Sequence, residues 1–230
     1  MTKKTVTLGC SFTAQYDPDV KPWPKLFRRL GHKVYDYSLN GSSNYDQFTK
    51  LVWHLTHGEA DNVYWLMTEF DRITFGSTGN LNAVSYDNNP DLEKHYKMWA
   101  KEHKNPDAEK WVTTQVKEQR MISEALSKTS LQYWVDHNVT LAMQAHNICK
   151  AYNINLKIIQ GIHPFNYYLY GYDKAKVIKA FIKSSYISPI DHLNCIIDHP
   201  DWKSKYSFSQ YDNHPNQAGA DYIFNLFANK

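Results

Sequence analysis

Short apolar runs alternate with amphipathic stretches along this chain, and this alternation constrains its fold more than any other feature. Strands are predicted at Thr5–Leu8, Lys33–Tyr37, Asn62–Met67 and Leu156–Gln160. Apolar residues at three- and four-residue steps predict helices at Trp23–Leu30, Asp46–His57, Leu131–Tyr152, Lys174–Ile182 and Pro215–Asn229. The third strand is apolar after its first residue, which is typical of a strand buried on both faces of a parallel sheet. We therefore expect the α/β class: a three-layer α/β/α sandwich with a mainly parallel sheet of about five strands.

The length of 230 residues fits one sizeable α/β domain spanning positions 1–230. The alternation of strand and helix is interrupted at about 76–111, where Gly, Asn, Ser and Pro accompany a charged stretch. We interpret this segment as an inserted, partly helical loop region rather than a second domain. Hydrophobic residues make up 42% and charged residues 21% of the chain, which is ordinary usage for a folded protein.

Charge, cysteine content and hydropathy narrow the classes of partner. The net charge of +3 is small for a nucleic-acid binder, which gathers basic residues on one face. Cys10, Cys149 and Cys195 lie far apart without a CxxC spacing, which argues against a disulfide framework or a zinc knuckle. The N-terminus lacks the apolar core of a secretion signal, and no run reaches the roughly 18 apolar residues of a membrane span. We expect a soluble protein of the cytoplasm, with neither nucleic-acid nor membrane partners; the sequence leaves the oligomeric state open.

Three segments place reactive groups where ligands gather in open α/β sheets, at the carboxyl ends of the strands. The turn at positions 9–11 follows the first strand and presents Ser11, and Gly41 after the second strand can offer an N–H to an oxyanion. Asp212 and His214 precede the last helix, where a histidine can act as base to a serine and a carboxylate can orient its ring. Each feature alone is an ordinary turn or helix cap. Their occurrence together, in this order, predicts a site with a nucleophilic serine.

These segments resemble those of the SGNH, or GDSL-like, hydrolases, and the resemblance extends over most of the chain. Gly-Cys-Ser at positions 9–11 is similar to the family's first block, Gly-Asp-Ser, and Asp212 with His214-Pro is similar to its last block. The resemblance implies a flavodoxin-like sandwich with Ser11 as nucleophile and first oxyanion donor, and Gly41 as second donor. It also implies that His214 is the general base and acid, oriented by Asp212. The opening Gly-Cys-Ser-Phe-Thr, with Gly-Ser-Ser-Asn in the second block, resembles a subgroup often met in bacteriophage genomes.

The chain departs from the family pattern at three places. The third block normally supplies an asparagine as a third oxyanion donor, but this chain reads Met-Thr-Glu at positions 67–69. We expect either the hydroxyl of Thr68 or the side chain of Asn44 to take that role. The family's aspartate usually lies three residues before the histidine, whereas Asp212 lies two before it. Cys10 stands where the family has aspartate; we interpret it as a packed thiol, with a cysteine nucleophile as the alternative.

Further residues are candidates for contacts with substrate. His163 closes the fourth strand, and Arg72 follows the third, so both are predicted to line the substrate pocket. A structural ion pair with Glu69 or Asp71 is the alternative for Arg72. The tyrosine-rich segment at 165–172 and the aromatic content of 15% fit either a stacking wall for a sugar or ordinary packing.

We expect no metal and no organic cofactor. His54 and His57 lie three residues apart on a predicted helix, but no third ligand with suitable spacing accompanies them. Neither GxGxxG nor GKS/T, the glycine patterns of dinucleotide and phosphate sites, occurs in the chain.

The predicted function is a serine esterase that hydrolyses an acyl ester, preferably an acetyl ester on a carbohydrate, through an acyl-serine intermediate. The expected partner is accordingly a small-molecule or carbohydrate ester. One alternative is an acyltransferase of the same mechanism with a sugar hydroxyl as acceptor. The other is a catalytically weak carbohydrate-binding or virion-associated protein, which the missing third-block asparagine favours and which would be located on a virion.

Overall fold

The computed structural model describes residues 2–70, 72–75, 79–82, 92–102, 110, 112–114, 116–117, 131–162, 183, 185, 195–210 and 212–229. Its main sheet has four parallel strands in the order β2-β1-β3-β6. The strands are β1 (Lys4–Gly9), β2 (Lys33–Asp36), β3 (Asn62–Met67) and β6 (Asn155–Gln160). All four predicted strands are confirmed. The described part of the chain gives this sheet four strands, against the expected number of about five.

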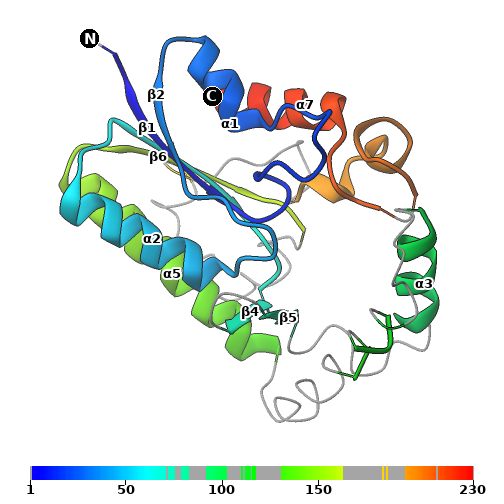
Figure 1. Ribbon diagram of the computed structural model, residues 1–230. Helices are drawn as coiled ribbons and strands as arrows, with labels where there is room; N and C mark the ends of the chain where they lie inside the picture. The colour runs from blue at the N-terminus through cyan, green and yellow to red at the C-terminus, as the bar shows by residue number, and fades with distance from the viewer. Residues whose placement is uncertain are drawn as a thin grey trace.

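Two pairs of helices cover the two faces of this sheet (Figure 1). Helices α2 (Asn44–His57) and α5 (Leu131–Ala151) lie on one face, and α1 (Trp23–Arg29) and α7 (Gln217–Ala228) lie on the other. The central strand β3 divides its side chains between two cores. Val63, Trp65 and Met67 join the core beneath α2 and α5, whereas Tyr64 and Leu66 join the core beneath α1 and α7. The structure thus confirms the three-layer α/β/α sandwich.

The helix ends follow local chemistry. Helix α2 begins two residues earlier than predicted because the Ser43 side chain caps it, accepting the N–H of Asp46 at 3.2 Å. Helix α7 begins two residues later than predicted, after Pro215, because Asn216 caps it through the N–H of Gly219 at 3.0 Å. The predicted helix at Lys174–Ile182 lies outside the described residues. Just after it, only positions 183 and 185 are described before the chain resumes at 195.

The region between β3 and α5 contains structure that the sequence pattern did not predict. A small antiparallel pair, β4 (Arg72–Phe75) and β5 (Gly79–Asn82), follows β3 directly. Each strand has only four residues, and β5 consists largely of Gly and Asn, which are disfavoured in strands. Helix α3 (Leu92–Glu102) lies within the segment at about 76–111.

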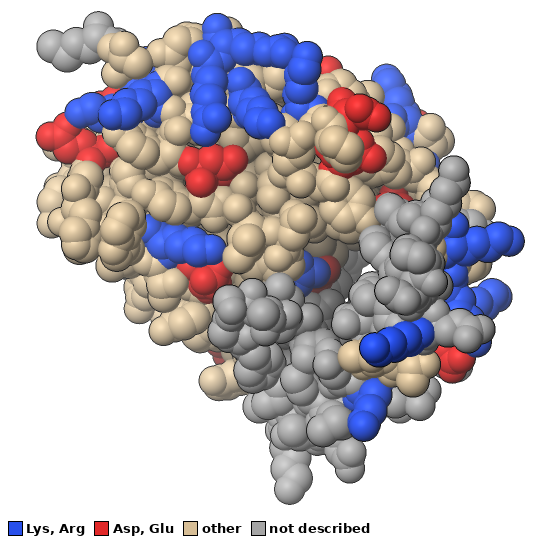
Figure 2. Space-filling model, in the orientation of Figure 1, with Lys and Arg blue, Asp and Glu red and all other residues tan. Residues whose placement is uncertain are grey.

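The surface mixes charges of both signs. In the view of Figure 2, Lys and Arg side chains gather over the upper edge, where α1 lies in Figure 1, with acidic side chains between them. Within the described ranges, no helix combines the length and the apolar character needed to cross a membrane.

Candidate active site

The turn after β1 places Ser11 at the carboxyl end of the sheet, where the residue is 8% exposed. The N–H groups of Thr13 and Ala14 both donate to the carbonyl of Cys10 at 2.9 Å, which closes the turn around Ser11. Position 9 requires glycine because an added Cβ would lie 1.9 Å from Thr13 Oγ1. The Cys10 side chain is buried in the core beneath α1 and α7, as expected for a packed thiol.

A turn from the other end of the chain brings His214 to Ser11. The backbone pairs Ser207 with Pro215, and the N–H of Phe208 donates to the His214 carbonyl at 3.1 Å. In this position, Nε2 of His214 lies 2.8 Å from Oγ of Ser11. This is hydrogen-bond distance, so the serine proton can pass directly to the imidazole.

Asp212 holds the opposite nitrogen of the imidazole. Its Oδ1 lies 2.5 Å from Nδ1 of His214 and also accepts the backbone N–H of His214 at 2.9 Å. The Asp212 N–H in turn donates to Oγ of Ser209 at 3.1 Å, and the Asp212 side chain is only 1% exposed. A spacing of two residues therefore lets the carboxylate reach the ring, and the three predicted side chains form one chain of hydrogen bonds.

The loop after β2 is anchored directly to the end of β1. The N–H of Leu39 and the hydroxyl of Ser42 both donate to the carbonyl of Gly9, at 3.2 and 3.0 Å. Gly41 lies between these anchors with a φ of 77°, a left-handed conformation that favours glycine. Within the described ranges, the N–H groups of Ser11 and Gly41 donate to no other group. The two predicted oxyanion donors therefore have no competing bond within these ranges.

The two side chains expected as a third oxyanion donor have other partners. Nδ2 of Asn44 donates to the Thr68 carbonyl at 3.2 Å and to Oδ1 of Asn138 at 2.7 Å. Oδ1 of Asn44 accepts the N–H of Thr68 at 2.8 Å. The Thr68 hydroxyl donates to the carboxylate of Glu69. Either side chain would have to break these bonds to act as an oxyanion donor.

Tyr16 is a site residue that the sequence analysis missed. Its ring lies parallel to the His214 imidazole, with 3.7 Å between centroids and 5° between planes. Its hydroxyl donates to Oδ2 of Asp212 at 3.4 Å. The only signal in the sequence was its position in the same loop as Ser11, five residues further on.

A cavity of about 270 Å³ lies at the N-terminal end of α2, close to the loop that carries Gly41. Ring side chains form much of its wall, namely Tyr45, Phe70, Trp134 and His137. Arg72 adds a charged group to the lining. Burial lowers the pKa of His137 below its ordinary value, which favours the neutral ring at neutral pH.

The remaining candidates divide between structural contacts and parts of the chain outside the described residues. Arg72 forms an ion pair with Glu69 at 2.7 Å, the structural alternative considered for it, while also lining the cavity. The ring of His54 contacts the Tyr37 hydroxyl at 2.9 Å and the Glu59 carbonyl at 3.2 Å. His163 and the tyrosine-rich segment at 165–172 lie outside the described residues.

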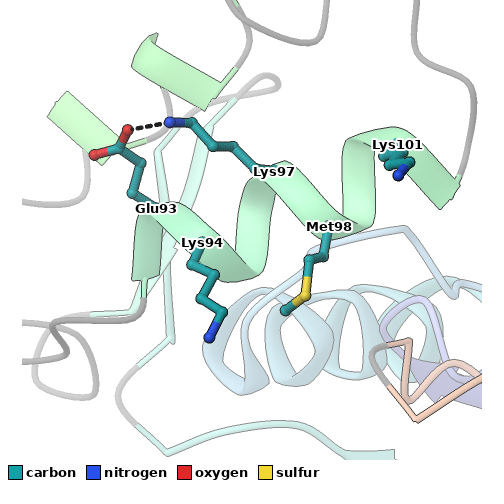
Figure 3. Close-up of a pocket in the computed structure, with 5 residues that line it drawn as sticks. All are labelled: Glu93, Lys94, Lys97, Met98 and Lys101. Carbon is teal, nitrogen blue, oxygen red and sulfur yellow. Dashed lines mark ion pairs between the residues drawn. The ribbon is translucent and has the colours of Figure 1, made fainter.

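A second cavity, of about 530 Å³, is lined by side chains of α3 (Figure 3). Glu93 and Lys97 reach toward each other there and form an ion pair at 2.7 Å, while Lys94 and Met98 extend to the other side of the helix. Of the predicted site residues that the structure describes, none lines this cavity. Among the described residues, no three His, Cys, Asp or Glu side chains are arranged to hold a metal ion.

No protein-family model and no curated protein sequence matches this chain. Solved structures of low sequence identity do match it. The psychrotrophic esterase EstA from Pseudoalteromonas sp., inhibited by monoethylphosphonate, aligns with a TM-score of 0.50 and 12% identity over 99% of this chain and 95% of its own. TesA aligns with a TM-score of 0.49 and 13% sequence identity, over 97% of this chain and 95% of its own. A candidate lipolytic protein of the G-D-S-L family from Desulfitobacterium hafniense DCB-2 aligns with a TM-score of 0.49 and 12% sequence identity, over 99% of each chain. The chain therefore shares the α/β fold of the esterase EstA.

Proposed function

We propose that this protein is a serine ester hydrolase of the SGNH type. The observation that carries the proposal is the continuous path from Ser11 Oγ through His214 to Asp212, with distances of 2.8 and 2.5 Å. The arrangement provides a nucleophile, a base in contact with it and a carboxylate that orients the base. The esterase EstA, which shares the fold, adds support.

The geometry supports a reaction in two halves. Ser11 Oγ attacks the acyl carbonyl while His214 Nε2 takes the serine proton, and the N–H groups of Ser11 and Gly41 stabilise the oxyanion. The tetrahedral intermediate collapses as His214 protonates the leaving alcohol, which leaves an acyl group on Ser11. Water then attacks this ester with His214 as base, and the carboxylic acid and free Ser11 are formed. Every proton in this sequence passes through one imidazole nitrogen.

The preferred substrate in this proposal is a small acyl ester, such as an acetyl ester, on a carbohydrate. The aromatic wall of the 270 Å³ cavity supports it, because flat ring faces such as those of Trp134 and Tyr45 suit the apolar face of a sugar. The cavity adjoins the loop of Gly41 through Ser43, the cap of α2. A sugar held there would lie at the same end of the sheet as Ser11.

The test compares the wild type with Ser11→Ala on p-nitrophenyl acetate and on an acetylated oligosaccharide. Ser204→Ala is the matched control, because Ser204 is exposed and its hydroxyl donates to the Asp201 carbonyl rather than to a residue of the site. We expect the wild type and the control to hydrolyse the esters and Ser11→Ala to lose roughly 10⁴-fold or more in kcat. Equal background rates from all three proteins would contradict the proposal.

Two further outcomes define the substrate. Trp134→Ala is expected to raise KM for the acetylated oligosaccharide and to leave hydrolysis of p-nitrophenyl acetate unchanged, since only the sugar contacts the cavity. Tyr152→Ala is its control, because Tyr152 is an exposed aromatic residue just beyond the C-terminal end of α5. Transfer of the acetyl group to added polyol in preference to water would assign the acyltransferase activity instead.

A further inference from the structure

We propose that Tyr16 is a positioning residue that stabilises the imidazolium form of His214 during the reaction. The proposal rests on the function above, because it concerns the charge that His214 acquires when it takes the proton of Ser11. Tyr16 contacts the base and the carboxylate that orients it: its ring contacts the imidazole of His214 and its hydroxyl contacts Asp212.

The stack between Tyr16 and His214 is close and nearly parallel. The ring centroids lie 3.7 Å apart and the planes differ by 5°, so the imidazole lies against the face of the phenol ring. The face of an aromatic ring carries negative charge density and attracts a cation within about 6 Å of its centroid. The ring of Phe208 supports Tyr16, with 6.0 Å between centroids and a tilt of 52°.

The hydroxyl end of Tyr16 completes the arrangement. Oδ1 of Asp212 is occupied by two contacts with His214, and Tyr16 donates to the other oxygen, Oδ2, at 3.4 Å. One side chain therefore restrains the plane of the imidazole and the carboxylate that orients it. Rotation of the imidazole away from Ser11 would break the stack.

The charge on His214 appears only as the serine proton moves. An interaction with the imidazolium is therefore stronger in the transition state than in the resting enzyme, which is the condition for raising kcat rather than lowering KM. Asp212 supplies the full counter-charge in the plane of the ring. Tyr16 supplies the partial negative charge of its face, perpendicular to that plane.

The test replaces Tyr16 with phenylalanine and with a series of ring-fluorinated phenylalanines of nearly the same shape. Fluorine withdraws density from the ring face, so each substitution weakens attraction for a cation while packing is retained. We expect Tyr16→Phe to stay within about 3-fold of wild type in kcat, because it keeps the ring. Further fluorination should lower kcat progressively, with Tyr16→Leu about 10-fold below wild type and KM for p-nitrophenyl acetate unchanged.

Tyr152→Leu is the matched control, because it makes the same replacement at an exposed tyrosine just beyond the end of α5 and should leave kcat unchanged. A kcat that is constant across the fluorinated series in an active enzyme would overturn the role of Tyr16 and leave the proposed function intact. A change confined to KM would overturn it as well. A wild type that hydrolyses no ester would overturn the proposed function and this role together.

Discussion

Oγ of Ser11 and Nε2 of His214 lie 2.8 Å apart although 203 residues separate them in the chain. The contact depends on two turns fixed by different means. The first follows the buried strand β1, and the second is held by Asn216, whose side chain caps α7 and donates to the Ser207 carbonyl at 2.8 Å. The sheet and α7 thus hold nucleophile and base together before any substrate binds.

Replacement of Asp212 with asparagine should reduce kcat by roughly 10³–10⁴-fold, as expected when a carboxylate no longer sets the tautomer of the base. The amide of Asn can donate to Nδ1 of His214 and favour the proton on Nε2, where it blocks removal of the proton from Ser11. Steady-state hydrolysis of p-nitrophenyl acetate measures the loss. Asp201→Asn, at an exposed turn residue, is the control. Activity of Asp212→Asn within tenfold of wild type would show that another group orients His214.

Asn138→Ala should lower the free energy of unfolding by about 1–3 kcal/mol. The side chain of Asn138 is buried and donates to the Phe70 and Trp134 carbonyls, both at 2.7 Å. It also accepts from Asn44, so its removal breaks three hydrogen bonds that link three segments of the chain. Urea unfolding measures the change, with Asn147→Ala on the exposed side of the same helix as the control. Equal loss in both variants would mean that this network does not stabilise the fold.

His146 should make the protein less stable in mild acid. The side chain is buried, its Nδ1 contacts Oγ of Ser185 at 2.9 Å, and burial, aided by the charge of Lys150, lowers its pKa below 6.5. Because the folded pKa lies below the unfolded value, the unfolded chain binds more protons as pH falls through 6.5, and stability is lost there. At higher pH both states hold the neutral ring and the effect vanishes.

The measurement is urea unfolding of the wild type and His146→Gln at about pH 8 and about pH 5. The wild type should lose more free energy of unfolding between these values than the variant does. The same pH dependence in both proteins would exclude His146 as a source of acid sensitivity.

The thiols should be inert in the folded protein. Cys10, Cys149 and Cys195 are all buried, burial raises the pKa of Cys149 to about 12, and burial together with Asp198 raises the pKa of Cys195. Only the thiolate reacts readily with alkylating reagents. Iodoacetamide should therefore leave esterase activity unchanged, with mass spectrometry showing three modified cysteines only after denaturation. Stoichiometric inactivation with modification of Cys10 would identify a cysteine nucleophile instead.

Much of the fold could be predicted because its signals are local. The strand Asn62–Met67 is apolar after its first residue, and α5 repeats apolar residues at helical steps over 21 residues. The pair β4 and β5 could not be predicted, because four-residue strands with Gly and Asn carry neither alternation nor strand propensity. The observed starts of α2 and α7 differ from the predicted ones by two residues, because the caps Ser43 and Asn216 determine where these helices begin.

The candidate site divides in the same way. Ser11, Gly41, Asp212 and His214 stand in recognisable motifs, and the structure brings Ser11, His214 and Asp212 into hydrogen-bond contact. Tyr16 belongs to no recognisable motif. Its role could not be predicted, because its contact with His214 forms only when the two turns meet in the folded protein. The hydrogen bonds of Asn44 and Thr68 with buried neighbours could not be predicted either, since they join three segments that are distant in the sequence.

The most direct test of the account is reaction with a fluorophosphonate, followed by mass-spectrometric mapping of the labelled peptide. The probe forms a stable bond only with an activated nucleophile, so it reports the pairing of Ser11 with His214 without the need for the natural substrate. We predict one label, on Ser11, in the wild type, and no label on the same time scale in His214→Ala. A label on another residue, or equal labelling of Ser11 with and without His214, would contradict it.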